Sequence, residues 1–577
     1  MLNILLQRMN LKNLLLSFFV MISVAGCSSL IGSNNTMLQN EAYASSDFYL
    51  DKANNSQDQD EKVNYQLLAI RALLNENKVA QAASLLSSLN DLDDAQQLDA
   101  SLLKATLLAM QRDNSAATSL LNTINLDSLS NSQKVRYYAV LAQTAENSHD
   151  AVGAINAHVQ MDRFITDMQR KQQNNDVIWG LLRNLDKNTL NSLTVDDNDV
   201  ALKGWIDLAK VYNDHISQPD QMRFAIQNWK TTYANHSAAY LLPTDLRGVV
   251  NFENLNIQQI ALLLPLSGNG ELIGKTILQG FNDARGNSPI VVKTYDTMAG
   301  TNVTDLINQA KQEGAQAVVG PLLKDNVEAL LNGNAMQGLS VLTLNTAPSM
   351  RPLQGVCYYG LSPEDEAQSA AVKMWNDGEV NPLVFAPQND LGQRSASAFN
   401  TKWQSLAGTD VNTYYYTLVD DILANLKNAT MNGKVNAIYV VADSQQLQEI
   451  KTALDNSDAH GIAIYATSRS NSANNGPDYR LTMNGVKFSD IPLLSDLNSA
   501  SYQQALKIAN GDYSLLRLYA MGADAWMLIN KFAELRQIPG YSINGLTGVL
   551  SAGEGCNIER AMTWMQYDNG NIKTIHY

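Results

Sequence analysis

The chain has 577 residues and a formal net charge of −15, and 45% of its residues are hydrophobic. This length exceeds what one hydrophobic core supports, so we expect at least two domains. The acidic balance excludes binding to nucleic acid or to anionic lipid headgroups through bulk electrostatics.

The first 26 residues have the order of a signal peptide. Basic residues at Arg8 and Lys12 precede an apolar run over residues 14–22, and the small residues Val24-Ala25-Gly26 precede Cys27. The cysteine makes this site a lipobox, so we expect Cys27 to be lipidated and to begin the mature protein. The alternatives are an ordinary signal peptide or a membrane anchor, but the apolar run is shorter than the roughly 20 residues that span a bilayer.

The residues after Cys27 predict where the lipoprotein resides. Ser28 and Ser29 follow, so there is no Asp in the second position, which retains enteric-type lipoproteins at the inner membrane. Resemblance to this sorting rule predicts anchoring in the inner leaflet of the outer membrane, facing the periplasm, with residues 27–35 as a lipidated tether. That compartment holds no ATP or NADH pool, which excludes enzymes that depend on them.

Residues 36–242 are expected to form an all-α domain. Strand-like runs are absent, and apolar residues recur at helical spacing, as in residues 65–74 and 79–89. Short polar breaks group the helices into pairs at residues 65–89, 100–121 and 135–164. The pattern resembles a tetratricopeptide (TPR)-like solenoid with a degenerate consensus, and a generic helical bundle is the alternative.

A linker is expected over residues 243–257, after which the pattern of apolar residues changes. From residue 258 to 577, short apolar strands alternate with helices of about 10–15 residues, which predicts parallel sheets. The expected strands are residues 260–266, 290–295, 317–320 and 340–344, then 383–386, 411–417, 437–441 and 462–465. Two such runs predict two Rossmann-like lobes. Ser362 before Pro363 and three acidic residues predicts a helix start.

One segment imitates a phosphate-binding loop. Gly268 to Thr276 lies between a predicted strand and a predicted helix and ends in Gly274-Lys275-Thr276, as a P-loop does. The pattern requires a first glycine at position 269, where this chain has Asn269. We therefore expect no nucleotide and no other cofactor.

Two cysteines remain besides Cys27. Cys357 and Cys556 are an even pair in an oxidising compartment, which favours a disulfide. The alternative is two buried, unpaired thiols.

Further motifs resemble known families. Leu263-Leu-Pro-Leu-Ser-Gly268 and Val318-Val-Gly-Pro321 resemble strands of a type I periplasmic binding protein. Four further segments stand out: Gly360-Leu-Ser-Pro-Glu-Asp-Glu-Ala367, Gly485-Val-Lys-Phe-Ser-Asp-Ile-Pro492, Arg517-Leu-Tyr-Ala-Met-Gly-Ala-Asp-Ala-Trp526 and Gly545-Leu-Thr-Gly-Val-Leu550. Together with the lipobox and the domain order, they resemble the LpoA family, the lipoprotein activators of class A penicillin-binding proteins.

The resemblance implies a role without catalysis. It implies an outer-membrane lipoprotein with a TPR-like domain and a type I binding-protein-like domain. The C-terminal domain would bind a bifunctional peptidoglycan synthase, a class A penicillin-binding protein, and stimulate it. The helical domain would serve as a spacer.

Two other functions compete with this one. A solute receptor would hold its ligand with hydroxyls and backbone amides after strand ends, but Leu322 and Leu323 follow Gly320-Pro321, where amino-acid receptors have Ser or Thr. A peptidoglycan hydrolase would need a nucleophile, an acid pair or a metal. The six histidines form no metal motif, the acids at 364–366 fit a helix start, and the tyrosines at 414–416 fit strand packing. We therefore expect no catalytic and no metal-binding residues.

Overall fold

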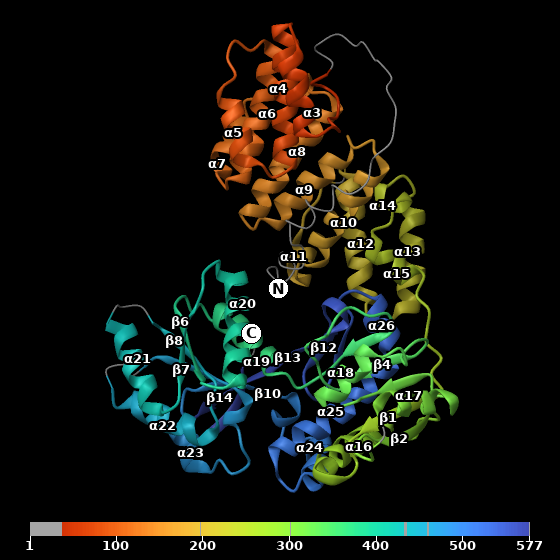
Figure 1. Cartoon of the computed structure of the whole chain (residues 1–577), viewed down its shortest axis with the longest axis vertical. Coiled ribbons are helices and arrows are strands. Elements are labelled where there is room, and N and C mark those ends of the chain that lie inside the picture. Colours follow the sequence, from red (N-terminus) through yellow and green to blue (C-terminus); the bar gives the residue numbers. More distant parts are fainter. Residues whose placement is uncertain (1–36, 197, 301, 432–434, 458–460, 576–577) are drawn as a thin grey trace. The chain divides into compact units, whose positions relative to one another are not determined.

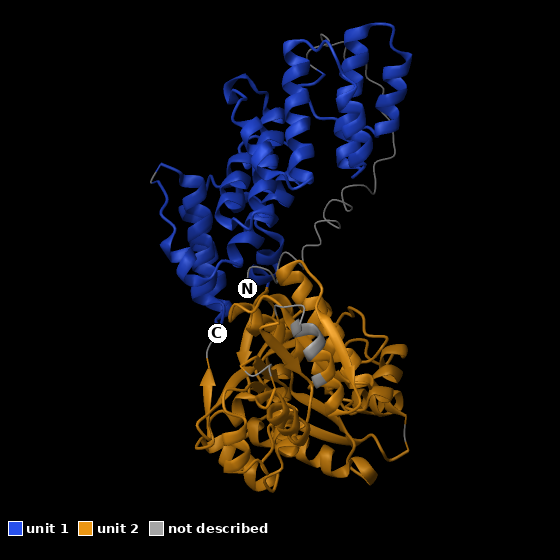
Figure 2. Ribbon diagram, turned by 90° about the vertical axis from the view of Figure 1, so that its left-hand side faces the viewer, with its two compact units in different colours: residues 1–251 blue, residues 252–577 orange. Residues whose placement is uncertain are grey.

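The chain divides into two compact units. The computed structural model describes residues 37–575 apart from 197, 301, 432–434 and 458–460. Unit 1 comprises residues 1–251 and unit 2 residues 252–577 (Figure 2). The expected signal peptide and tether, with Cys27, lie outside the described residues. No described helix is both long enough and apolar enough to span a membrane.

Unit 1 is helical throughout its described part (Figure 1). Its helices pack in successive pairs, α4 on α5, α6 on α7 and α8 on α9, as a TPR-like array requires. Its elements are α3 (Ser46–Asn55), α4 (Gln59–Asn75), α5 (Val79–Ser87), α6 (Asp94–Met110), α7 (Asn114–Leu121), the 3₁₀ turn η3 (Leu126–Ser128), α8 (Asn131–Asn147), α9 (Ala151–Asp162), α10 (Met168–Arg183), α11 (Lys187–Ser192), α12 (Val200–His215), α13 (Pro219–Thr232), α14 (Ser237–Tyr240) and α15 (Thr244–Val250).

Polar side chains set where these helices begin. Asp93 and Ser130 form capping boxes with Gln96 and Gln133, so each cap satisfies a backbone N–H that the helix itself leaves free. The expected helical pairs at residues 65–89, 100–121 and 135–164 are confirmed as α4–α5, α6–α7 and α8–α9.

The expected linker over residues 243–257 contains a helix in its first part. Helix α15 occupies residues 244–250, buries Leu246 and Val249, and packs on α10 and α13. Pro243 is compatible with this helix, because proline is tolerated at a helix start as well as in a loop. The chain passes to unit 2 between Asn251 and Phe252.

A buried ionic triad joins three helix pairs of unit 1. Asp99 on α6 is fully buried and accepts hydrogen bonds from Arg71 Nη2 on α4 at 3.0 and 3.1 Å. Arg136 on α8 binds the same carboxylate through Oδ1. One side chain therefore ties the first helices of three successive pairs together.

Unit 2 begins with lobe A, built on a parallel five-stranded sheet in the order β2-β1-β3-β4-β5. Strands β1, β3, β4 and β5 are buried because helices cover them, as their nearly continuous apolar sequences predict, whereas the edge strand β2 is largely exposed. The elements of lobe A are β1 (Gln259–Leu264), the 3₁₀ turn η4 (Gly268–Gly270), α16 (Glu271–Arg285), β2 (Val291–Asp296), α17 (Val303–Gln312), β3 (Ala317–Val319), α18 (Lys324–Asn332), β4 (Ser340–Thr343), β5 (Val356–Tyr358), α25 (Tyr513–Asn530) and α26 (Phe532–Gln537).

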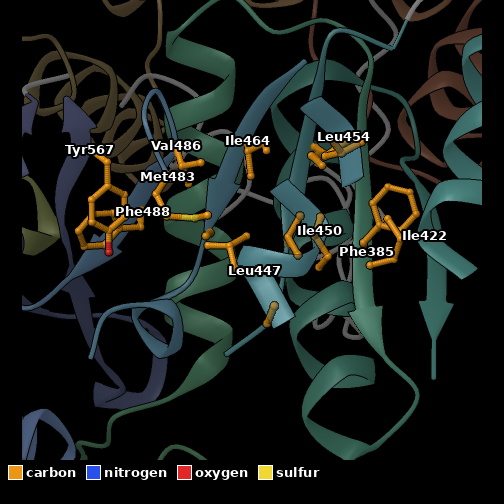
Figure 3. Packing of buried hydrophobic residues seen from close by; sticks show 14 of the residues in the cluster. Phe385, Ile422, Leu447, Ile450, Leu454, Ile464, Met483, Val486, Phe488 and Tyr567 are labelled. Atoms are coloured by element: carbon orange, nitrogen blue, oxygen red, sulfur yellow. The ribbon is translucent and has the colours of Figure 1, made fainter. Parts of the chain in front are cut away.

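Lobe B has a seven-stranded sheet in the order β15-β14-β10-β9-β8-β6-β7, with β14 and β15 antiparallel to their neighbours. Figure 3 shows part of its core, where Phe385, Leu447 and Phe488 pack in one buried cluster. Its elements are α19 (Pro363–Asn376), β6 (Pro382–Pro387), α20 (Asp390–Ala407), β7 (Asn412–Tyr416), α21 (Val419–Met431), β8 (Ala437–Val440), α22 (Ser444–Asp455), β9 (Ala463–Ala466), η5 (Ser468–Ser470), α23 (Pro477–Thr482), β10 (Lys487–Asp490), β14 (Thr563–Asp568) and β15 (Asn571–Ile575).

The chain passes between the two lobes three times, after β5, after β10 and after β13. Two Rossmann-like lobes joined in this way form the type I periplasmic-binding-protein architecture that the sequence motifs predict. The remaining elements lie around these crossings: η6 (Pro492–Leu494), α24 (Ala500–Ile508), and a three-stranded antiparallel sheet of β11 (Ser542–Asn544), β12 (Val549–Ala552) and β13 (Ile558–Ala561), with η7 (Glu554–Cys556) before β13.

Cys357 on β5 and Cys556 in η7 are joined by a disulfide, across 199 residues of sequence. Beside it, Tyr358 forms a parallel bridge with Asn557, so the segment before β13 lies along β5. The bond therefore attaches the C-terminal part of the chain to the edge strand of lobe A.

Helices α16 and α25 cross closely in lobe A because each presents a glycine to the other. A Cβ on Gly280 would lie 2.0 Å from the carbonyl oxygen of Tyr519, and a Cβ on Gly522 would lie 2.0 Å from that of Ile277. Backbone atoms of the opposing helix thus fill the space that a side chain would need.

We expect Gly522→Ala to destabilise unit 2 by about 2–3 kcal/mol, because the new methyl group must push α25 away from α16. Urea unfolding of the whole chain, followed by hydrogen exchange in peptides from α16 and α25, measures this. Gly476→Ala is the control, since a Cβ there meets no heavy atom within 4 Å; its cost should stay below about 1 kcal/mol. Equal stability of Gly522→Ala and the parent protein would contradict the close crossing.

Candidate functional site

The strand-end edge of lobe A is the place where a binding protein of this fold holds a ligand. Its loops are fixed by side chains. Asp296 Oδ1 accepts hydrogen bonds from the backbone N–H groups of Leu266, at 2.8 Å, and Met298, at 2.9 Å. Asn345 Nδ2 donates to the carbonyl oxygen of Leu322 at 3.0 Å. These bonds join the loops after β1 and β2, and those after β3 and β4, so side chains of the protein itself hold the loops of this edge together.

Three apolar side chains are exposed at this edge, beside charged ones such as Lys324. Leu272 is 63% exposed, Met298 42% and Leu323 39%. Leu323 is also the N-cap residue of α18, a position at which a serine or threonine would offer a hydroxyl, and it makes no capping hydrogen bond. An edge of this chemistry suits apolar contact with a surface better than hydrogen bonding to a polar solute.

In the segment that resembles a P-loop, the glycine and the lysine contact other residues of the chain. Residues 268–270 form the turn η4, and a Cβ on Gly274 would lie 2.0 Å from the carbonyl oxygen of Pro265, so this glycine permits close packing of α16 on β1. The Lys275 ammonium binds Glu271 on the same helix. The charge that a phosphate would need is therefore paired.

The junction between the lobes contains an ion pair with two hydrogen bonds. Arg517 on α25 donates from Nε to Asp490 Oδ1 at 3.0 Å and from Nη2 to Oδ2 at 2.7 Å, and Asp490 is fully buried. Nη2 also donates to the carbonyl oxygens of Ser468 and Asn471, which belong to lobe B. This guanidinium links α25 of lobe A to two segments of lobe B, β10 and the turn η5 with its C-cap Asn471.

The acidic residues at 364–366 begin α19, as predicted. Ser362 Oγ accepts a hydrogen bond from the Asp365 N–H at 3.2 Å. Arg560 Nε donates to the Asp365 carboxylate at 3.2 Å. Burial raises the pKa of Asp365 to about 6, and Arg560 opposes that rise. Glu366 accepts hydrogen bonds from the Ser468 N–H and hydroxyl, at 3.1 and 2.7 Å. These carboxylates therefore hold structural contacts rather than facing each other as an acid pair.

Asp524 on α25 is a second buried carboxylate that organises a loop. It accepts hydrogen bonds from the backbone N–H groups of Leu546 and Thr547, both at 2.7 Å. Burial raises its pKa to about 6, against the effect of these hydrogen bonds. Tyr359 contacts Thr547 Oγ1 at 2.8 Å, so the loop is tied to the first lobe crossing.

The three tyrosines of β7 are mainly packing residues. Tyr414 stacks on Phe385, and Tyr416 is buried with its hydroxyl donating to the Val441 carbonyl at 2.7 Å. Tyr415 alone is largely open, at 42% exposure.

Among the described residues, no group of three or more His, Cys, Asp or Glu side chains is placed to hold a metal ion. Of the three cysteines singled out from the sequence, Cys357 and Cys556 are paired and Cys27 lies outside the described residues. The partners of the junction carboxylates could not be predicted from the sequence. Arg560 binds a residue 195 positions earlier, and no local spacing signals such a pair.

The fold and these sites define a class: a TPR-like helical domain followed by a two-lobed domain of the type I periplasmic-binding-protein fold. The family described as "LppC putative lipoprotein" matches residues 39–570. A Pasteurella multocida protein named penicillin-binding protein activator LpoA is 51% identical over 578 residues, which cover 100% of both chains. The chain belongs to this LpoA family of lipoproteins.

Solved structures of relatives agree with the assignment. A crystal form of Haemophilus influenzae LpoA is similar with a TM-score of 0.84 and 49% identity, covering 94% of this chain and 100% of that one. The C-domain of the same species' LpoA, described as a regulator of PBP1A, is 53% identical with a TM-score of 0.53. It covers 55% of this chain and is itself covered completely.

Proposed function

We propose that this protein is an outer-membrane lipoprotein that binds and stimulates a bifunctional class A penicillin-binding protein and so regulates peptidoglycan synthesis. The observation that carries this proposal is the match to named activators over the whole length of both units, at 51% identity. The described relative of unit 2 alone is a regulator of PBP1A, which points to unit 2 as the part that contacts the synthase.

The protein acts as an activator and not as an enzyme. The carboxylates at the lobe junction are engaged by Arg517, Arg560 and backbone donors, which leaves them in structural roles. A solute-receptor lipoprotein is the alternative function, and the exposed Leu323 and Met298 at the ligand edge count against it.

The anchor is Cys27, whose lipids insert into the inner leaflet of the outer membrane, with residues 27–35 as the tether. A mature lipoprotein carries several acyl chains, and more than one chain is needed for stable anchoring. Unit 1 then separates the anchor from the synthase-binding unit along the chain.

Purified residues 28–577, added in equimolar amount, should increase the rate at which the cognate class A synthase makes peptidoglycan from its lipid-linked precursor. The chain alone should not consume peptidoglycan or precursor. A type I solute receptor without a helical domain is the control and should have no effect. The proposal fails if the synthase rate is unchanged. The receptor alternative gains if a small solute raises the melting temperature, since a ligand of the native state stabilises it by mass action.

A further inference from the structure

Unit 2 has a groove at the edge of lobe A where β4 and β5 begin, opposite the strand-end edge. Its volume is about 950 Å³. The end of α18, the loops that enter β4 and β5, helix α26 and Leu255 line it. No residue of the strand-end loops or of the lobe junction lines the groove, so it is a separate feature of the surface.

The groove has a mixed lining, and part of its wall is firm and apolar. Leu331, Val356 and Phe532 are at most 2% exposed, so their positions are fixed by the core behind them. Leu255, which precedes β1, is 47% exposed and adds an open apolar contact. The buried wall residues and the exposed Leu255 together offer a partner a preformed apolar contact surface.

Two arginines line the same groove. Arg351 is held by backbone carbonyls, with Nη2 donating to Leu331 at 2.8 Å and Nη1 to Ser349 at 3.3 Å. Lys311 lies near one wall and donates to the carbonyl oxygen of Gln337 at 2.8 Å. This side of lobe A is therefore locally cationic in a chain of net charge −15.

Arg536 is the arginine without an anionic partner. Its guanidinium lies 5.7 Å from the centre of the Phe532 ring, and its Nη1 would be 3.9 Å from a Cβ on Gly355, which places it over the start of β5. Within the described part of the chain, it forms no ion pair with a carboxylate. Desolvation lowers its pKa, and no neighbouring acid raises it again.

We propose that this groove binds an acidic segment of the partner synthase, with a carboxylate of that segment on Arg536 and an apolar neighbour of that carboxylate against the exposed Leu255. The inference rests on the proposed function and locates the contact. A guanidinium binds a carboxylate through two parallel hydrogen bonds, and the neighbouring Phe532 favours the planar geometry. Charge complementarity selects an acidic partner, and arginines and aromatic residues are the side chains that most often dominate interface energies.

The test measures binding of the purified synthase to immobilised residues 28–577 at low and moderate salt. Arg536→Glu should weaken binding about tenfold, and Arg536→Gln should weaken it less, because reversal adds repulsion to the lost contact. Both variants should bind with a smaller salt dependence than the parent, since one screened charge contact is gone. Melting temperatures should match that of the parent.

Lys507→Glu supplies the matched control. Lys507 is exposed on α24, outside the groove, and the substitution makes the same change of charge. It should leave binding within about twofold of the parent. Lys324→Glu, at the strand-end edge of lobe A, makes that charge change on the opposite side.

Three results would overturn the inference. Arg536→Glu could bind as the parent does while Lys324→Glu does not, which would place the contact at the strand-end edge. Arg536→Glu could alter only self-association of the chain, measured by sedimentation, which would make the groove an interface between copies. If the parent chain does not bind the synthase at all, the proposed function fails, and this inference fails with it. If the parent chain binds the synthase and Arg536→Glu binds equally well, the groove is rejected as the contact, and the proposed function is not.

Discussion

Replacing Asp99 by alanine should destabilise unit 1 by about 3–5 kcal/mol. The carboxylate is fully buried between Arg71 and Arg136, and its removal leaves two guanidiniums inside the unit without their counter-charge. The loss should spread over α4, α6 and α8, since these three helices share the single carboxylate.

Hydrogen exchange measured by mass spectrometry gives the opening free energies of these helices in the intact chain. Asp94→Ala, on the exposed side of the same helix, is the control and should change stability by less than about 1 kcal/mol. If exchange in α6 is equally slow in Asp99→Ala and the parent, the triad contributes nothing.

The pH dependence of this contact has a definite sign. Burial raises the pKa of Asp99, but Arg136 and Arg71 outweigh that effect and hold the pKa below its ordinary value. The stabilisation is therefore complete above the unfolded pKa of about 3.9 and is lost as the pH falls through the lower folded value. Asp99→Ala should remove this part of the acid sensitivity of unit 1.

Replacing Cys27 by alanine should abolish anchoring in the outer membrane. Without the thiol there is no lipid attachment, so the protein should remain as the uncleaved precursor or appear in the soluble periplasmic fraction. Stimulation of the synthase in cells should then be lost, although purified residues 28–577 remain active, because the anchor places the activator and does not form part of its contact surface.

Membrane fractionation and the mass of the N-terminal peptide measure this outcome. Ser28→Ala is the matched control and should be lipidated and sorted as the parent is. Ser28→Asp places an acidic residue directly after the lipidated cysteine and should retain the protein at the inner membrane. Mature Cys27→Ala found in outer membranes would show that another residue provides the anchor.

Local patterns predicted the repeated parts of the fold. The apolar spacing of residues 65–74 and the capping residues Ser362 and Pro363 each determine a helix through neighbours within four positions. Buried runs such as residues 437–441 identified the parallel strands for the same reason.

Contacts between distant residues were not predictable in this way. Asp99 lies 28 residues from Arg71 and 37 from Arg136 in the sequence. Separations of this size carry no local pattern that would indicate a contact. The three-residue strands β5 and β11 are too short to show a pattern of their own. The groove at Arg536 depends on α26 lying beside the start of β5, which only the assembled lobe brings about.

The chain path through unit 2 imposes an order on its biogenesis. Lobe A takes its sheet from residues 259–358 but its helix α25 from residues 513–530, and all of lobe B except β14 and β15 is inserted between them. A polypeptide that emerges from its amino end must therefore keep the face covered by α25 open while residues 359–512, nearly half of the unit, are delivered. Cys357 likewise cannot form its disulfide until Cys556 has emerged. In unit 1, by contrast, each helix pair packs on a pair that follows within the next few dozen residues.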